Sequence, residues 1–139
     1  MSERSELTRF EPTASVAGAP FWEASREQRF VLPWCTACGE AHWFPREFCP
    51  HCLAPELEWR EASGDGVVYA ASVMPKPGNP LMAGQGPYPI VLVDLVEGVR
   101  VFSTVVGTDP DAVAVGQSVH VAWEPLSDGR HLPVFTVIA

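Results

Sequence analysis

The sequence predicts a mainly β protein: an N-terminal arm and a short helix, then a small metal-clipped ribbon, then a five-stranded barrel of the OB type. All four cysteines fall between residues 35 and 52 as two Cys-x-x-Cys pairs, a pattern typical of a zinc ribbon. After residue 61 the chain changes to five short runs rich in Val and Ile, separated by turn residues, as strands are. We expect boundaries at residues 1–33 for the arm and helix, 34–60 for the ribbon and 61–139 for the barrel.

The first 33 residues are predicted to form a loose arm and one helix. Residues 1–19 are polar and lack periodicity. The stretch PFWEASREQRF, Pro20–Phe30, favours a helix because Pro20 suits the first helical position. The apolar stripe of this helix is poor, so its aromatic end, Phe21 and Trp22, must dock on something. The sequence leaves open whether it docks on this chain or on a partner protein.

The ribbon is defined by its cysteines. The N-terminus lacks an apolar signal core and no run approaches the ~20 apolar residues of a membrane helix, so we expect a cytoplasmic location, where cysteines favour metal over disulfides. Two Cys-x-x-Cys pairs place four thiolates around Zn²⁺, a closed shell that predicts a structural site. Ten residues separate the pairs, fewer than the ~15–20 of the common pattern. The predicted ligands are Cys35, Cys38, Cys49 and Cys52.

Several alternatives remain at the ribbon. His42 and His51 lie within it and are candidate replacements for a cysteine ligand, and iron is the alternative metal. A redox role is disfavoured because thioredoxin-type sites use one Cys-x-x-Cys within a βαβ unit. Large side chains around the metal compensate for a small core, but aromatic residues also stack on nucleobases. The aromatic residues of the ribbon are Trp34, Trp43, Phe44, Phe48 and Trp59.

The C-terminal part is predicted to be a barrel. Both faces of Ile90–Val96 are largely apolar, which predicts a central strand covered on both sides. The number of strands, a long first loop over Pro75–Pro89 and a connector before the fourth strand fit an OB-fold. An open antiparallel sheet also fits the count. A sheet closed into a barrel is favoured over the open sheet because several strands are apolar on both faces. The other predicted strands are Val67–Met74, Val99–Val106, Ser118–Pro125 and Leu132–Ala139.

Residues 20–139 resemble a known family. The stretches that carry the resemblance are PFWEASREQRFVLPWCTACGEAHWFPREFCPHC (20–52), GDGVVYAASV (64–73), PYPIVLVDLVEGVRVFSTVVG (87–107) and VGQSVHVAW (115–123). They are similar to the thiolase-associated proteins that join a rubredoxin-like zinc ribbon to an OB-fold. The four zinc ligands of that family fall on the four cysteines of this chain.

The resemblance implies a non-catalytic partner of a thiolase-like or ketosynthase-like enzyme that acts on acyl-CoA, with the barrel holding the partner or the CoA thioester. The family offers no catalytic residues to carry over. From the residues alone, we expect the surface for the partner to combine the Pro75–Pro89 loop with the Phe21–Trp22 end of the helix.

The residues themselves predict no catalytic site. No Gly-rich phosphate loop opens a helix, and Asp65 has the place of a turn residue. We expect Asp94 to face outward, with a buried, perturbed carboxylate as the alternative, and His120 and His131 to be ordinary strand residues.

The rival class is a module that binds single-stranded nucleic acid, since ribbons and OB-folds both do so. Nine basic and seventeen acidic residues give a net charge of −8, which disfavours phosphate backbones. The same charge limits any grip on CoA phosphates to a few side chains, with Lys76, Arg46 and Arg100 as candidates.

Overall fold

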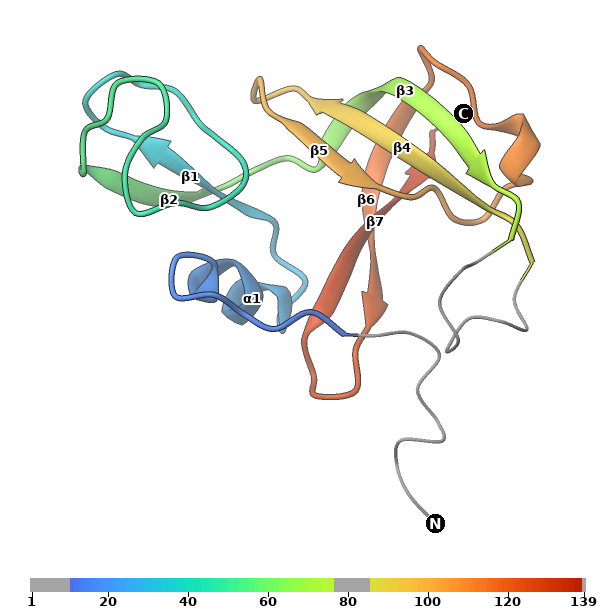
Figure 1. The fold of residues 1–139 in the computed structure, drawn as a ribbon, viewed down its shortest axis with the longest axis horizontal. Helices are drawn as coiled ribbons and strands as arrows, with labels where there is room; N and C mark the ends of the chain where they lie inside the picture. The colour runs from blue at the N-terminus through green and yellow to red at the C-terminus, as the bar shows by residue number, and fades with distance from the viewer. Residues whose placement is uncertain (1–10, 77–85, 139) are drawn as a thin grey trace.

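The computed structural model describes residues 11–76 and 86–138, and within them the chain is mainly β (Figure 1). The elements are α1 (Ala19–Ser25), β1 (Val31–Cys35), β2 (Leu57–Glu61), β3 (Asp65–Met74), β4 (Tyr88–Leu95), β5 (Arg100–Ser103), the 3₁₀ turn η3 (Pro110–Ala112), β6 (Ser118–Pro125) and β7 (His131–Val137). None of the helices in these residues has the length and apolar character that a membrane-spanning segment requires. Of the predicted Pro75–Pro89 loop, residues 77–85 lie outside the described part.

The five-stranded sheet curls until its two edges meet. Its strand order is β5-β4-β3-β6-β7, and the edges join through a parallel bridge between Val105 and Phe135. The Val106 N–H donates to Phe135 O at 2.8 Å, and the Phe135 N–H donates to Thr104 O at 3.0 Å. Closure satisfies edge groups that an open sheet leaves unpaired. The predicted OB-type sheet is therefore confirmed, as a curled five-stranded half-barrel.

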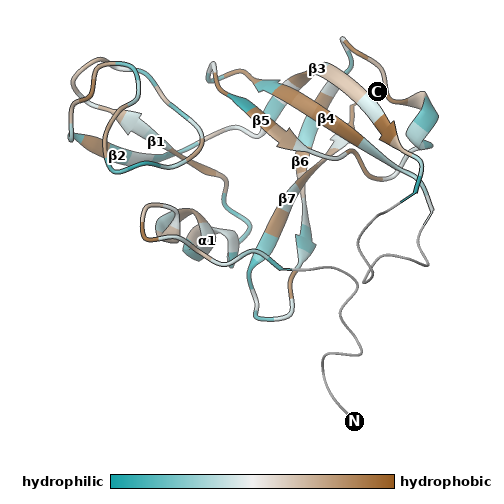
Figure 2. Cartoon of the chain, viewed as in Figure 1, coloured by the Kyte–Doolittle hydropathy of each residue, from teal (hydrophilic) through white to brown (hydrophobic). Residues whose placement is uncertain are grey.

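Strand β4 is central, between β3 and β5, as predicted, but only one of its faces is fully covered. Val91, Val93 and Leu95 point inward and are buried. The alternate residues, among them Ile90 and Leu92, stay half-exposed. Figure 2 shows that β4 is hydrophobic along most of its length. Within the described part the predicted cover is confirmed for the inner face, whereas the outer face is buried only in part.

Helix α1 starts where the sequence predicts and ends earlier. Pro20 lies in its first turn. The helix stops at Ser25 because Gln28 adopts a left-handed backbone, with φ of 57°. The Gln28 N–H then donates to Ser25 O at 3.0 Å and the Arg29 N–H to Ala24 O at 3.1 Å, which is a Schellman-type ending. Residues 29 and 30 thereby turn into the ribbon instead of continuing the helix.

Five aromatic side chains, which we call the aromatic cluster, join α1, the ribbon and the barrel. Phe21 is 2% exposed and lies edge-on to Trp43 of the ribbon, with ring centroids 4.9 Å apart. Phe30 lies edge-on to Trp123 of β6 at 6.0 Å, and 6.0 Å from Phe21. Trp22 completes the cluster, 5.0 Å from Phe21. Edge-to-face pairs add to the free energy gained from burial, so one continuous core holds all three parts.

Polar contacts dock α1 on the hairpin between β6 and β7. The His131 N–H donates to Ser25 Oγ at 3.1 Å, and His131 Nδ1 lies 2.8 Å from Ser25 O. Arg26 donates to Asp128 O at 2.7 Å, beside the contact of Arg130 with the Trp22 ring. The helix therefore docks on its own chain. The prediction that the Phe21–Trp22 end forms a partner surface is wrong for Phe21, whose ring is buried.

Replacing Phe21 with alanine should lower the free energy of unfolding by about 3–5 kcal/mol, because a fully buried ring leaves a cavity. Phe44, which is 63% exposed, is the matched control, and its alanine variant should change stability by less than about 0.5 kcal/mol. Urea denaturation followed by tryptophan fluorescence measures both. Equal effects of the two substitutions would contradict the central place of Phe21.

Alanine substitutions at Gly64 and Gly98 distinguish the cost of a steric clash from the cost of backbone strain. Both have positive φ, 82° and 91°. A Cβ on Gly64 would lie 2.4 Å from Val121 Cγ1, whereas a Cβ on Gly98 meets nothing within 4 Å. Gly98→Ala should cost about 1–2 kcal/mol for the left-handed backbone, and Gly64→Ala about 1–3 kcal/mol more for overpacking. The comparison of the two denaturation midpoints is the test, and a larger loss for Gly98→Ala would contradict it.

Candidate metal centre

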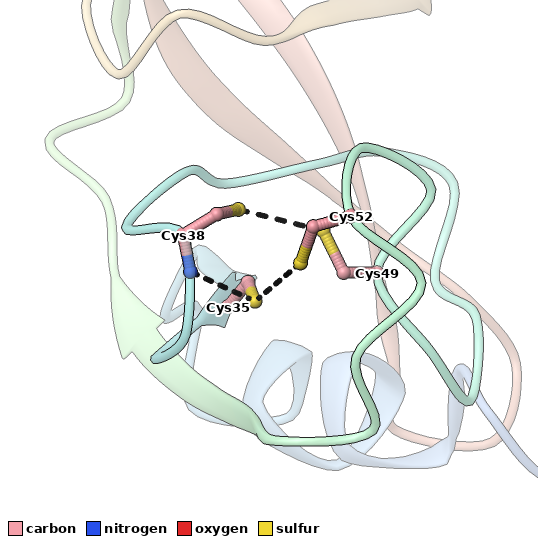
Figure 3. Close-up of side chains that lie close together, drawn as sticks. All are labelled: Cys35, Cys38, Cys49 and Cys52. Atoms are coloured by element: carbon pink, nitrogen blue, oxygen red, sulfur yellow. Dashed lines mark hydrogen bonds between the residues drawn. The ribbon is translucent and has the colours of Figure 1, made fainter.

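The four predicted cysteines come together at one end of the β1–β2 ribbon, and their side chains point toward one another (Figure 3). Their Sγ atoms all lie within 4.8 Å of one another. The Sγ atoms of Cys35 and Cys52 are 3.6 Å apart, and those of Cys38 and Cys49 are 3.7 Å apart. Sulfurs about 2.3 Å from a tetrahedral Zn²⁺ lie about 3.8 Å from one another. The separations fit Zn²⁺ and exceed the ~2.05 Å of a disulfide.

The two knuckles repeat one backbone pattern. In the first, the Cys35 N–H donates to Glu40 O at 2.9 Å, and the Gly39 N–H donates to Cys35 O at 2.8 Å. In the second, the Cys49 N–H donates to Ala54 O and the Leu53 N–H to Cys49 O, both at 2.8 Å. Each turn holds its two sulfurs on the same side. The local hydrogen bonds therefore organise the thiols.

Gly39 and Leu53 occupy equivalent positions after the two Cys-x-x-Cys pairs. Both have a left-handed backbone, with φ of 80° and 66°. The sequence predicts this role for Gly39, because glycine adopts positive φ without strain. The sequence does not predict a left-handed backbone for Leu53. The repeat of the knuckle spacing was the only signal that could have identified Leu53.

Backbone N–H groups point at two of the sulfurs. The Cys38 N–H lies 3.4 Å from Cys35 Sγ, and the His51 N–H lies 3.3 Å from Cys49 Sγ. Such donors stabilise the thiolate form, which is the form that binds metal. Charge-assisted hydrogen bonds of this kind also fix the orientation of the sulfurs. The donor set thus suits a thiolate-bound cation.

The thiols compete for ionisation. The Cys38 backbone N–H is the main cause that lowers the pKa of Cys35 to about 7. For Cys38, the Glu40 backbone N–H lowers the pKa, but burial and the neighbouring thiols together outweigh it and raise the pKa to about 12. Several thiolates at these distances repel one another. Four of them coexist only when a cation balances their charge.

The two histidines within the ribbon are not part of the sulfur group. Among the described residues the group contains the four cysteines alone. His51 Nε2 lies 3.3 Å from Ala41 O. His42 is 3% exposed, and neither ring nitrogen has a partner in the described part. Burial lowers the pKa of His42, and His51 and Arg46 add repulsion.

The other candidate residues lie on the barrel. Asp94 faces outward and accepts two hydrogen bonds from Arg100, at 2.6 and 3.1 Å, which hold the pKa of that carboxyl below its usual range. His120 Nδ1 lies 2.7 Å from Asp65 Oδ1 on the surface. His131 is engaged by α1, as described above. None of these groups lies in the sulfur cluster.

Most arginines of the described residues are neutralised by carboxylates of the same chain. Arg26, Arg29, Arg60, Arg100 and Arg130 each pair with a carboxylate. Arg46 and Lys76 are exposed and form no ion pair within residues 11–76 and 86–138. Phosphate-backbone binding requires clustered free cations, so this arrangement disfavours the nucleic-acid alternative.

The fold and the cysteine group define a class, a rubredoxin-like zinc ribbon joined to an OB-fold. A family model described as the ChsH2 rubredoxin-like zinc ribbon domain matches residues 22–58, and one described as the ChsH2 C-terminal OB-fold domain matches residues 59–124. A "DUF35 domain-containing scaffold protein" from Methanothermobacter thermautotrophicus is 32% identical over 68% of this chain and 71% of its own length. The chain belongs to this family, the DUF35 proteins with the ChsH2 arrangement of domains.

Two further similarities carry enzyme names. A "Probable enoyl-CoA hydratase alpha subunit" from Thermomonospora curvata is 37% identical over 83% of this chain, which spans only 36% of that relative. A chain of a solved structure named "Ltp2-ChsH2(DUF35) aldolase" superimposes with a TM-score of 0.81 and 34% identity, over 91% of this chain and 98% of that one. Nearly the whole chain thus matches a protein whose solved structure is named as an aldolase.

Purified protein should contain one Zn²⁺ per chain, and Cys49→Ser should lose it together with most of the order of the ribbon, because metal binding supplies folding energy in so small a unit. His51→Ala, the matched control beside Cys52, should keep full metal content. Elemental analysis and the near-UV circular dichroism of the ribbon tryptophans measure the two effects. If chelation left the spectrum and the thermal transition unchanged, a structural metal would be ruled out.

Proposed function

We propose that this chain is the non-catalytic subunit of a thiolase-like enzyme, an acyltransferase or an aldolase, that acts on acyl-CoA. The observation that carries the proposal is the match over nearly all of both chains to the solved protein named as an Ltp2–ChsH2 aldolase. The scaffold-protein name of the archaeal relative supports a role in assembly. The hydratase name of the other relative supports a CoA-linked setting, although most of that protein lies outside the match.

Within this proposal the ribbon is structural. Cys35, Cys38, Cys49 and Cys52 hold Zn²⁺, which closes the two knuckles and leaves no position for a substrate. The closed site also fixes both ends of the loop between the knuckles, which carries Trp43 of the aromatic cluster. The four cysteines form no disulfide, which suits a reducing compartment. We therefore assign the complex to the cytoplasm.

Any direct contact of this chain with CoA falls to few side chains. Arg100, a candidate from the sequence, is already engaged by Asp94 and by the ring of Tyr69. Arg46 on the ribbon and Lys76 after β3 are the exposed cations without an ion pair in the described residues. Two isolated cations on a chain of net charge −8 give weak binding to phosphates. We infer that the enzyme subunit makes most of the contacts with CoA and that this chain forms a surface next to the CoA site.

The proposal is tested by purifying the tagged protein gently from its native host and identifying its partners by mass spectrometry. A thiolase-like subunit should co-purify in a fixed ratio, and the reconstituted pair should turn over an acyl-CoA that this chain alone leaves unchanged. The same tag on an unrelated acidic protein is the control. Nucleic acid as the bound component, or no enzyme subunit, would overturn the proposal.

A further inference from the structure

The outer surface of β3, β4 and β5 carries an apolar stripe, which we call the outer face. Strand pairing places Leu92 opposite Phe102 and Val67 opposite Asp94. Tyr69 is exposed on the same side of β3 as Val67, next to the shift in register between Val68 and Ala70. Ala70, Leu92 and Phe102 therefore form one row across the three strands, and Tyr69 lies beside this row at the bulge. The neighbouring residues of each strand, such as Val68, Val93 and Val101, point into the core.

The outer face is uncovered in the described part of the molecule. Phe102 is 65% exposed, Tyr69 51% and Val67 43%, while Leu92 between them is half-buried. Solvated faces of antiparallel sheets are ordinarily polar. Here the β4 sequence is apolar on both sides, although the chain fully covers only one. Exposed apolar residues that gather on one face make that face a candidate for an interaction site.

Arg100 and Asp94 neutralise each other beside the aromatic rings of the outer face. Arg100 donates to both carboxylate oxygens of Asp94, at 2.6 and 3.1 Å, and its guanidinium lies 3.4 Å from the centroid of the Tyr69 ring. The Arg100–Asp94 pair is formed within this chain, so its hydrogen bonds are kept when a partner displaces water from the face. Covering it therefore costs less than covering an unpaired charge. This pair adds no net charge to the face, on a chain whose net charge is −8.

We propose that the outer face, centred on Phe102, Tyr69 and Leu92, docks against a neutral apolar surface of the enzyme subunit, an inference that rests on the proposed function. The charges of the outer face favour an uncharged protein surface as the partner. Nucleic acid and anionic lipid require free cations, and Arg100, the cation of this face, is neutralised by Asp94. A second copy would add its own excess of negative charge.

Size also argues against a dimer of this chain built on the outer face. A stable interface buries about 800 Å² on each partner, and a fully buried aromatic residue contributes about 150–250 Å². Two half-exposed aromatic rings and their aliphatic neighbours supply roughly 300 Å² on this scale. The outer face therefore forms the apolar centre of a wider contact whose polar rim comes from other parts of this chain. Such centres contain the residues that dominate affinity.

The ribbon has exposed apolar residues of its own, Phe44 and Leu53. Its surface differs from the outer face in the charged groups beside them. Arg46 and Glu47 are exposed beside Phe44, and Arg46 has no ion pair with a described residue. Docking there would desolvate an unpaired cation. Phe44 is 63% exposed, close to the 65% of Phe102, so it provides a matched control.

The experiment uses the full chain and the enzyme subunit that co-purifies with it. Phe102→Thr should weaken the affinity at least about 30-fold, the size of an interface hot spot, while Phe44→Thr should change it less than about 3-fold. Threonine keeps the preference for a strand, and equal thermal transitions will show that both variants fold. On wild-type protein, oxidative footprinting should show protection of Tyr69 and Phe102, and not of Phe44, when the complex forms.

The outcomes are distinguishable. If the complex forms but Phe102→Thr binds as the wild type does and Phe44→Thr does not, the outer face is wrong and the proposed function stands. If no enzyme subunit co-purifies, both proposals fail. If the chain alone sediments as a dimer that Phe102→Thr dissociates, the occupant is a second copy and the present assignment is overturned.

Discussion

Edge-to-face packing of Phe21, Phe30, Trp43 and Trp123 is the interaction on which the rest of the structure depends. The ribbon has two strands, too few to be stable alone, and α1 has seven residues, too few for an independent helix. Each therefore depends on contacts with another part. Phe21 and Phe30 lie between the ribbon and β6 and provide those contacts. The relative position of the ribbon and the barrel follows from this packing.

The metal centre and the aromatic cluster support the ribbon from opposite ends. The four cysteines close the knuckles at the end away from the barrel, and Trp43 attaches the loop between the knuckles to the cluster. Loss of either support leaves a chain segment with little apolar surface to bury. The ribbon therefore extends the barrel core, and the four cysteines at its distal end are placed to hold a metal ion.

Local patterns predicted the features that depend on local sequence. The cysteine spacing indicated the knuckles, and alternation indicated β6 over its observed bounds. The early end of α1 was missed because Gln28, not glycine, takes the left-handed backbone. The docking of Phe21 was left open because its contacts come from distant residues. The prediction that both faces of β4 are covered failed for the outer face, which is buried only in part. An apolar pattern on both faces does not tell how far the second face is buried by the same chain.

The docking of α1 on the β6–β7 hairpin joins residues far apart in the sequence. The hydrogen bonds of His131 with Ser25 and of Arg26 with Asp128 span 106 and 102 residues. During synthesis at ~5–20 residues per second, the helix leaves the ribosome roughly 5–20 s before its docking site exists. For that interval Phe21 and Trp22 have no barrel to cover them. The formation of the last hairpin is the step that completes the docking of the helix.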